Sequence, residues 1–168
     1  MSDRAHEAHE AHEAHETHET HGARSAQALA EAVVHKMLAT DALSRWLGIE
    51  VLEIAPHRST CRMTVREEMV NGFGTSHGGI VFSLADSALA FATNASGRLS
   101  VAIDCSISYP AAVHPGDILT AVAVEESSSN RLAFCDVTVR NQADAIVGHF
   151  RGTVYRTTRQ HFPDSHPE

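Results

Sequence analysis

Alternating hydrophobic and polar positions over the second half of the chain predict a β-sheet. The pattern is clearest in residues 132–140, where every second residue from Ala133 to Val139 is apolar and bulkier or polar side chains stand between. This alternation is typical of a strand with one buried and one solvated face. Further strand-like stretches are residues 49–54, 60–65, 101–109, 118–125 and 145–155. Turn-forming residues separate them, which favours antiparallel pairing.

Two segments have helical patterns. Residues 25–38 predict an amphipathic helix, and residues 44–48 a short second turn before the first strand. Residues 79–96 form a helix-favouring run that is apolar on nearly every side, and such a helix has to be wrapped by other elements. We therefore expect an α+β fold in which a long antiparallel sheet curls around one central helix, and a second subunit covers what the sheet leaves open.

The chain divides into one domain and two tails. Residues 1–22 are a low-complexity His/Glu segment, with a histidine at every third position from His6 to His21. A period of three drifts around a helix of 3.6 residues per turn, so we expect a disordered or partly helical tail. Binding of Zn or Ni by these imidazoles is the alternative. The domain is expected over residues 23–157, followed by a polar tail over 158–168.

Composition narrows the class of protein. The 168 residues are 43% hydrophobic, which suits one globular domain, and no apolar run is long enough for a membrane span. The first 21 residues carry −5 of the net charge of −8, so the domain itself carries only −3, which argues against nucleic-acid binding. Three widely spaced cysteines form neither a disulfide framework nor a CxxC metal site, and no secretory signal opens the sequence. A cytoplasmic protein is the simplest interpretation.

Candidate chemistry lies where the glycine-rich stretch Asn71-Gly-Phe-Gly-Thr-Ser-His77-Gly78-Gly79 meets the central helix. The first N–H groups of a helix lack internal partners, so they can bind an anion or a developing negative charge. Asp86 follows in an almost wholly apolar segment, where a carboxylate must be paired, shifted in pKa or functional. Backbone donors together with such a carboxylate suggest hydrolysis of an acyl group.

The spacing of these groups carries a second prediction. Seven helical positions separate Gly79 from Asp86 by ~10 Å along one helix. This distance is too long for both groups to contact the same substrate carbonyl group. Two antiparallel helices from two chains would bring them together, so the site is expected across a dimer interface. A structural role remains the alternative for Asp86, through hydrogen bonds from Ser83 or Ser87 or through contacts with the other chain. His77 and Asn71 could equally be turn residues.

The run Asn71-Gly-x-Gly-x-x-His77-Gly-Gly-x-x-Phe82-Ser-Leu-Ala-Asp86-Ser-Ala-x-Ala-x-Ala-x-Asn94 resembles the signature of the hotdog-fold acyl-CoA thioesterases, and among them the phenylacetate-degradation (PaaI) type. The resemblance covers roughly residues 35–157 and implies hydrolysis of an aryl-acetyl-CoA, such as phenylacetyl-CoA or its hydroxylated relative, by a homodimer or homotetramer without metal or cofactor. It implies that Asp86 activates water or attacks the thioester. Gly78, with Gly79 beside it, would polarise the carbonyl, and His77 and Asn71 would line the site.

One segment departs from the family pattern. Relatives often carry a basic residue and a proline after the strand that follows the helix, where this chain has Tyr109-Pro110-Ala111-Ala112-Val113. If that basic residue holds CoA phosphate in relatives, other residues must do so here. Arg140, Arg151 and Arg156 are the candidates, and each could equally be a solvated strand residue. An acyl-CoA-binding module or regulator without turnover is the alternative function, and a hotdog dehydratase is a more distant one.

Overall fold

The computed structural model describes residues 26–162. Residues 26–40 are helical. The elements that follow are α2 (Ala42–Leu47), β1 (Glu50–Ala55), β2 (Arg58–Thr64), a 3₁₀ turn (Glu67–Met69), α3 (Gly78–Asn94), β3 (Arg98–Ser108), β4 (Ile118–Ser128), β5 (Leu132–Arg140) and β6 (Ile146–Gln160). The His-rich tail and its expected disorder lie outside the described residues.

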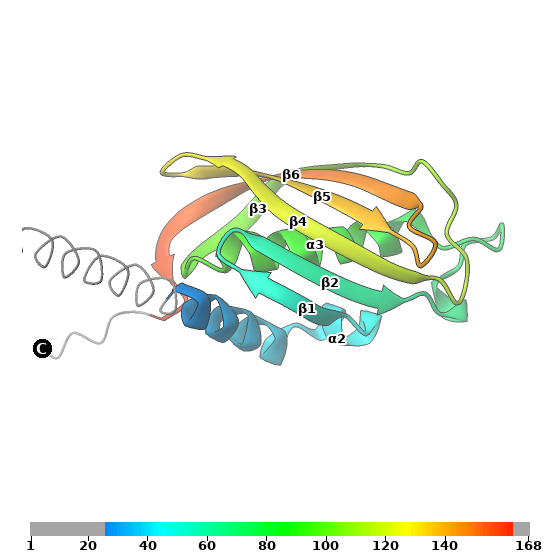
Figure 1. Cartoon of the computed structure of the whole chain (residues 1–168), viewed down its shortest axis with the longest axis horizontal. Helices are drawn as coiled ribbons and strands as arrows, with labels where there is room; N and C mark the ends of the chain where they lie inside the picture. The colour runs from blue at the N-terminus through cyan, green and yellow to red at the C-terminus, as the bar shows by residue number, and fades with distance from the viewer. Residues whose placement is uncertain (1–25, 163–168) are drawn as a thin grey trace, which may run out of the picture.

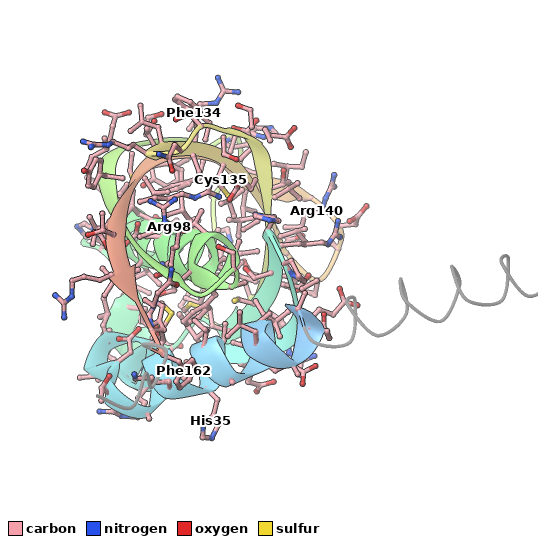
Figure 2. All side chains as sticks on the ribbon, turned by 90° about the vertical axis from the view of Figure 1, so that its left-hand side faces the viewer. His35, Arg98, Phe134, Cys135, Arg140 and Phe162 are labelled. Atoms are coloured by element: carbon pink, nitrogen blue, oxygen red, sulfur yellow. The ribbon has the colours of Figure 1, made fainter. Side chains whose placement is uncertain are left out.

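The strands form one antiparallel sheet in the order β1-β2-β4-β5-β6-β3. The sheet curls around α3, and the helix of residues 26–40 lies across the side that the sheet leaves open (Figure 1). Viewed from one end of the molecule, the strands arch over α3 (Figure 2). The predicted α+β architecture, a long antiparallel sheet around one central helix, is confirmed.

The predicted alternation in β5 sets its orientation. Ala133, Cys135, Val137 and Val139 are buried, while the residues between them are half-buried or exposed. Cys135 points toward α3 and Phe134 away from it (Figure 2). Burying every second side chain against the helix removes apolar area from water at ~25 cal/mol per Å².

Helix α3 is less completely covered than its composition predicts. Its buried residues are Val81, Leu84, Ala85, Ala88, Leu89, Phe91, Ala92, Thr93 and Asn94. Gly79, Ser83, Asp86 and Ala90 are half-buried or exposed, and their spacing of three and four residues places them on one stripe of the helix. One face of α3, which contains the candidate carboxylate, is therefore only partly covered by this chain.

The C-terminal boundary differs from the sequence prediction. Strand β6 continues to Gln160, which pairs with Arg98, so the domain runs beyond the expected end at residue 157. Side chains explain the extension: Thr157 donates to the Leu99 carbonyl, and His161 Nε2 lies 2.7 Å from Asn94 Oδ1. A polar sequence therefore continues the strand because its side chains bond to neighbouring elements.

Candidate active site

A hydrogen-bonded loop leads into α3. Asn71 Oδ1 accepts from the backbone N–H groups of Phe73 at 2.8 Å and Thr75 at 3.4 Å. Its Nδ2 donates to Thr75 Oγ1 at 3.0 Å, and the backbone N–H of Asn71 donates to the Thr75 carbonyl. Gly74 has φ 76°, a left-handed conformation that glycine adopts without strain. Asn71 thus closes the loop, the turn role that its sequence also allowed.

The start of α3 presents one free backbone donor. His77 is the N-cap, and its Nδ1 accepts from the Gly79 N–H at 3.0 Å, so the proton of the neutral imidazole is on Nε2. The Gly78 N–H has no acceptor among the described residues. The two glycines are therefore not equivalent. Gly78 can polarise a bound carbonyl directly, whereas Gly79 is available only if His77 turns away.

Tyr109 fixes Gly78 from the other side. Its hydroxyl donates to the Gly78 carbonyl at 2.9 Å, and a Cβ added to Gly78 would lie 3.1 Å from the phenol ring. Any larger residue at this position would push the Tyr109 ring away by a few tenths of an ångström. Tyr109 directly follows β3, so the end of that strand holds the beginning of the central helix.

Asp86 lies two turns further along α3, on the partly covered stripe. Burial raises the pKa of its carboxyl, and a hydrogen bond from Cys105 lowers it in part. Cys105 Sγ, on β3, lies 3.9 Å from Asp86 Oδ1 and provides the one side-chain hydrogen bond recorded for this carboxylate among the described residues. Neither Ser83 nor Ser87 bonds to Asp86; they bond to the Gly79 carbonyl and to Ser44.

The structure brings His77, Gly78 and Gly79 together, while Asp86 stands apart from them. Eight positions of regular helix separate Gly78 from Asp86, which corresponds to ~12 Å. Sequence reasoning missed two side chains that touch these residues, Cys105 and Tyr109. The alternating strand pattern of residues 101–109 was visible, but only the fold shows that this strand lies beside the site.

A pocket of about 330 Å³ opens beside Gly78. It is lined by Thr75, Ser76, Gly78, Val81, Tyr109, Pro110, Ala111, Ala112 and Val113. Much of this lining is the segment in which the chain departs from the pattern of its relatives. Small and apolar side chains there leave space for an uncharged group next to the free Gly78 N–H.

The three candidate arginines differ sharply. Arg156 is buried and bonded to both Glu125 oxygens at 2.6 Å, so it cannot reach a phosphate at the surface. Arg151 is exposed but binds Asp136 through two hydrogen bonds, and Arg140 pairs with Asp144. The prediction for Arg156 is therefore wrong, and the other two would have to leave their carboxylates.

Within residues 26–162, no group of three or more His, Cys, Asp or Glu side chains could hold a metal ion. The histidine repeat lies outside this range, so its metal binding stays a prediction. In the same part of the chain, no helix is both long and apolar enough to cross a membrane.

A curled antiparallel sheet around one central helix, with a free N–H at the helix start and a half-buried carboxylate on the partly covered stripe, is the arrangement expected of a hotdog-fold thioester hydrolase. Comparison with known proteins agrees. Residues 73–147 match the family model of the thioesterase superfamily. A putative esterase of Archaeoglobus fulgidus is 36% identical over 137 residues, covering 82% of this chain and 89% of that protein.

The Escherichia coli acyl-coenzyme A thioesterase PaaI is 36% identical over 122 residues, covering 73% of this chain and 87% of that protein. The solved structure of E. coli PaaI superposes with a TM-score of 0.78 at 34% identity, covering 80% of this chain and 97% of that one. The chain therefore belongs to the hotdog-fold acyl-CoA thioesterases of the PaaI type. It is an enzyme, a thioester hydrolase.

Proposed function

We propose that the protein hydrolyses an aryl-acetyl-CoA, such as phenylacetyl-CoA or hydroxyphenylacetyl-CoA, to the free acid and CoA. The proposed catalytic site is supported chiefly by one observation: the free Gly78 N–H lies on the same helix as the half-buried carboxylate of Asp86. The proposed acyl group is supported by the likeness to E. coli PaaI, a protein of the phenylacetic acid degradation operon. The pocket beside Gly78 has room for an aromatic ring.

The Gly78 N–H donates to the thioester oxygen and stabilises the negative charge that develops there, a contribution of ~3 kcal/mol for one such donor. In one route Asp86 removes a proton from water, and the water oxygen bonds to the carbonyl carbon. The carbon–sulfur bond then breaks, the CoA thiolate leaves and takes up that proton, and the free acid remains. In the other route the Asp86 carboxylate attacks the carbonyl carbon and displaces the CoA thiolate to form a mixed anhydride, which water then cleaves to the free acid and the regenerated carboxylate.

His77 and Asn71 hold the frame of this site. His77 keeps the first turn of α3 in place through Gly79, and its Nε2–H is left to donate to the substrate or to water. Asn71 closes the loop that precedes it. Gly79 becomes a second oxyanion donor only in a state in which His77 has released it.

The active unit is a homodimer, or a homotetramer built as a dimer of dimers. Gly78 and Asp86 of one chain lie ~12 Å apart, so one complete site needs Gly78 of one subunit and Asp86 of another. β3 supports this, because it is an edge strand of the sheet and its Val101 and Ile103 are 46% and 58% exposed. An unpaired apolar edge next to the uncovered stripe of α3 is a surface that a second copy can cover.

Mixed dimers test this sharing. Gly78→Pro deletes the N–H at the first helical position, where proline suits the backbone although its ring would displace the Tyr109 phenol, and Asp86→Asn removes the carboxylate. Each variant alone should be inactive, while a mixture with proven subunit exchange should regain activity because one site in each heterodimer is whole. A fully active monomer, or an inactive mixture, would exclude a shared site.

Thiol release from acetyl-, hexanoyl-, palmitoyl-, benzoyl- and phenylacetyl-CoA tests the reaction. We expect the highest kcat/KM for phenylacetyl-CoA and at least ~100-fold lower kcat for Asp86→Asn, the effect of losing an acid–base group. Because burial opposes ionisation of Asp86, the Asn variant should be as stable as the wild type at neutral pH. Tight binding of acyl-CoA without thiol release from any of them would favour a binding module instead. An increase in ultraviolet absorbance from a conjugated enoyl product would indicate a dehydratase.

We also propose a cytoplasmic location. Cys61, Cys105 and Cys135 are free thiols in the structure, as is usual in a reducing compartment. Recovery of the activity in the cytoplasmic fraction of the source cells is the expected result.

A further inference from the structure

The segment from β3 into the following loop touches both ends of the proposed site. Tyr109 donates to the Gly78 carbonyl at 2.9 Å, and Cys105 Sγ lies 3.9 Å from Asp86 Oδ1. Each of the two helical residues assigned to the chemistry thus meets one side chain of the same short segment.

The two contacts have matching spacing. Four residues of extended chain from Cys105 to Tyr109 span ~13 Å, and eight helical residues from Gly78 to Asp86 span ~12 Å. The strand and the helix therefore run side by side over this length, in opposite directions, with a contact at each end. A shift of β3 by two residues would break both contacts at once, so the register of this edge strand sets the geometry of the site.

The Cys105 side chain is protonated, so its thiol can donate a hydrogen bond. Burial raises the pKa of Cys105 to about 11, and the nearby carboxylates of Asp86 and Asp104 contribute to the rise. Cys105 is thus a neutral thiol near pH 7, and its S–H can donate to the carboxylate of Asp86. In the described part of the chain, no charged side chain is recorded as lowering the pKa of Asp86, so this hydrogen bond is the interaction that favours its ionised form.

Gly152 makes room for this arrangement. It lies on β6 directly opposite Cys105, and a Cβ added there would lie 3.4 Å from Cys105 Sγ and overlap Leu89 of α3. β6 therefore approaches the helix closely at the level of the thiol. The half-buried side chain of Cys105 therefore lies between the Gly152 backbone and Asp86 of α3.

We propose that Cys105 and Tyr109 are positioning residues for thioester hydrolysis: Cys105 orients Asp86 and stabilises its carboxylate, and Tyr109 holds Gly78 so that its N–H keeps its direction. This inference rests on the proposed roles of Gly78 and Asp86. Cys105 makes no bond to the acyl group, because its high pKa leaves almost no thiolate at neutral pH.

The thiol is tested by Cys105→Ala, with Cys61→Ala as control. Cys61 is a buried thiol on β2 with no hydrogen bond to Asp86. The carboxyl signal of Asp86 is followed by ¹³C NMR during a pH titration and assigned by its loss in Asp86→Asn. In Cys105→Ala its pKa should rise by about 0.5, and the acid limb of kcat/KM should move up equally, because a donor to the ionised form is gone. An unchanged pKa in the folded variant would overturn the role of Cys105.

The phenol is tested by Tyr109→Phe, with Tyr155→Phe on β6 as control. The ring remains, so packing is retained and only the hydroxyl is removed. We expect kcat to fall about 10-fold with KM unchanged, because the donor is misplaced rather than the binding surface lost. The amide signals of Gly78 and Gly79 should shift in Tyr109→Phe and not in the control. Unshifted signals together with a kcat within twofold of the wild type would overturn the role of Tyr109.

These outcomes separate the inference from the function on which it rests. An active wild type with unaltered Cys105→Ala and Tyr109→Phe variants overturns positioning and leaves the thioesterase standing. A fully active Asp86→Asn, or a wild type that releases thiol from no acyl-CoA, overturns the proposed site and the positioning roles with it. The NMR titration and amide shifts need no turnover, so they report the contacts in either case.

Discussion

Two arginine–carboxylate pairs on β6 offer a controlled measurement of what burial does to an ion pair. Arg156 lies 2.6 Å from both carboxylate oxygens of Glu125, and the two side chains are 9% and 4% exposed. Arg151 also binds both oxygens of its partner Asp136, through Nε at 2.8 Å and Nη2 at 3.1 Å, but these side chains are 72% and 45% exposed. Replacing each arginine with methionine removes the charge and keeps much of the volume.

The expected losses differ several-fold. Arg156→Met leaves a buried carboxylate without its buried arginine partner, a change that costs ~3–5 kcal/mol. His57 Nδ1, 3.1 Å from Glu125, offsets part of the loss, so we expect ~3 kcal/mol and a Tm lower by ~10 °C. Arg151→Met should cost ~0–1 kcal/mol, because water solvates the carboxylate that remains.

Urea unfolding at pH 7, followed by circular dichroism, measures both variants. Burial alone would raise the pKa of Glu125, but hydrogen bonds from His57 and Arg156 outweigh it and hold the pKa below its usual value. A lowered pKa contributes stability above the pKa of the unfolded chain and loses it as the pH falls through the folded value. The wild type should therefore lose its advantage over Arg156→Met progressively as the pH falls below the ordinary glutamate pKa of ~4.3. Equal losses for the two arginine variants at pH 7 would refute this account of burial.

Three further predictions follow from the structure. Gly152→Ala should destabilise the fold by ~1–3 kcal/mol, because its Cβ would overlap Leu89, whereas Gly72→Ala, with nothing within 4 Å, should leave the Tm nearly unchanged. The acid limb of kcat/KM should lie above the ordinary aspartate pKa of ~3.9, because burial raises the pKa of Asp86 and only its ionised form is active; a limb below pH 3.9 would contradict this. Deleting residues 1–22 and treating the protein with EDTA should remove bound Zn or Ni and leave kcat/KM within twofold, and recovery of lost activity by added Zn would disprove metal independence.

The sequence predicts most of the fold because the periodicity of hydrophobic residues can be recognised within each segment alone. The alternation in residues 132–140 and the apolar run from residue 79 each determine an element without knowledge of its neighbours. The end of β6 could not be predicted in this way. Residues 158–160 are polar, and they stay in the strand because Gln160 pairs with Arg98 across the sheet.

The candidate site was predicted in part for a similar reason. The free N–H donor can be predicted from the glycines and from the position of the helix N-terminus, which are both local features of the sequence. That His77 occupies the Gly79 N–H depends on the direction of one side chain. That Arg156 turns inward depends on strand register, which places it within reach of Glu125. Neither direction can be inferred from residue type.

The features left unsatisfied in a single chain lie along β3 and the part of α3 that it contacts. They are the free Gly78 N–H, the half-buried Asp86 carboxylate and the unpaired edge of β3. A folded chain normally satisfies its backbone donors and avoids burying a carboxylate without a strong partner. These costs are tolerable if a second subunit and a substrate together supply the missing partners. Assembly and catalysis would then use the same groups, and substitutions on β3 should alter both oligomeric state and turnover.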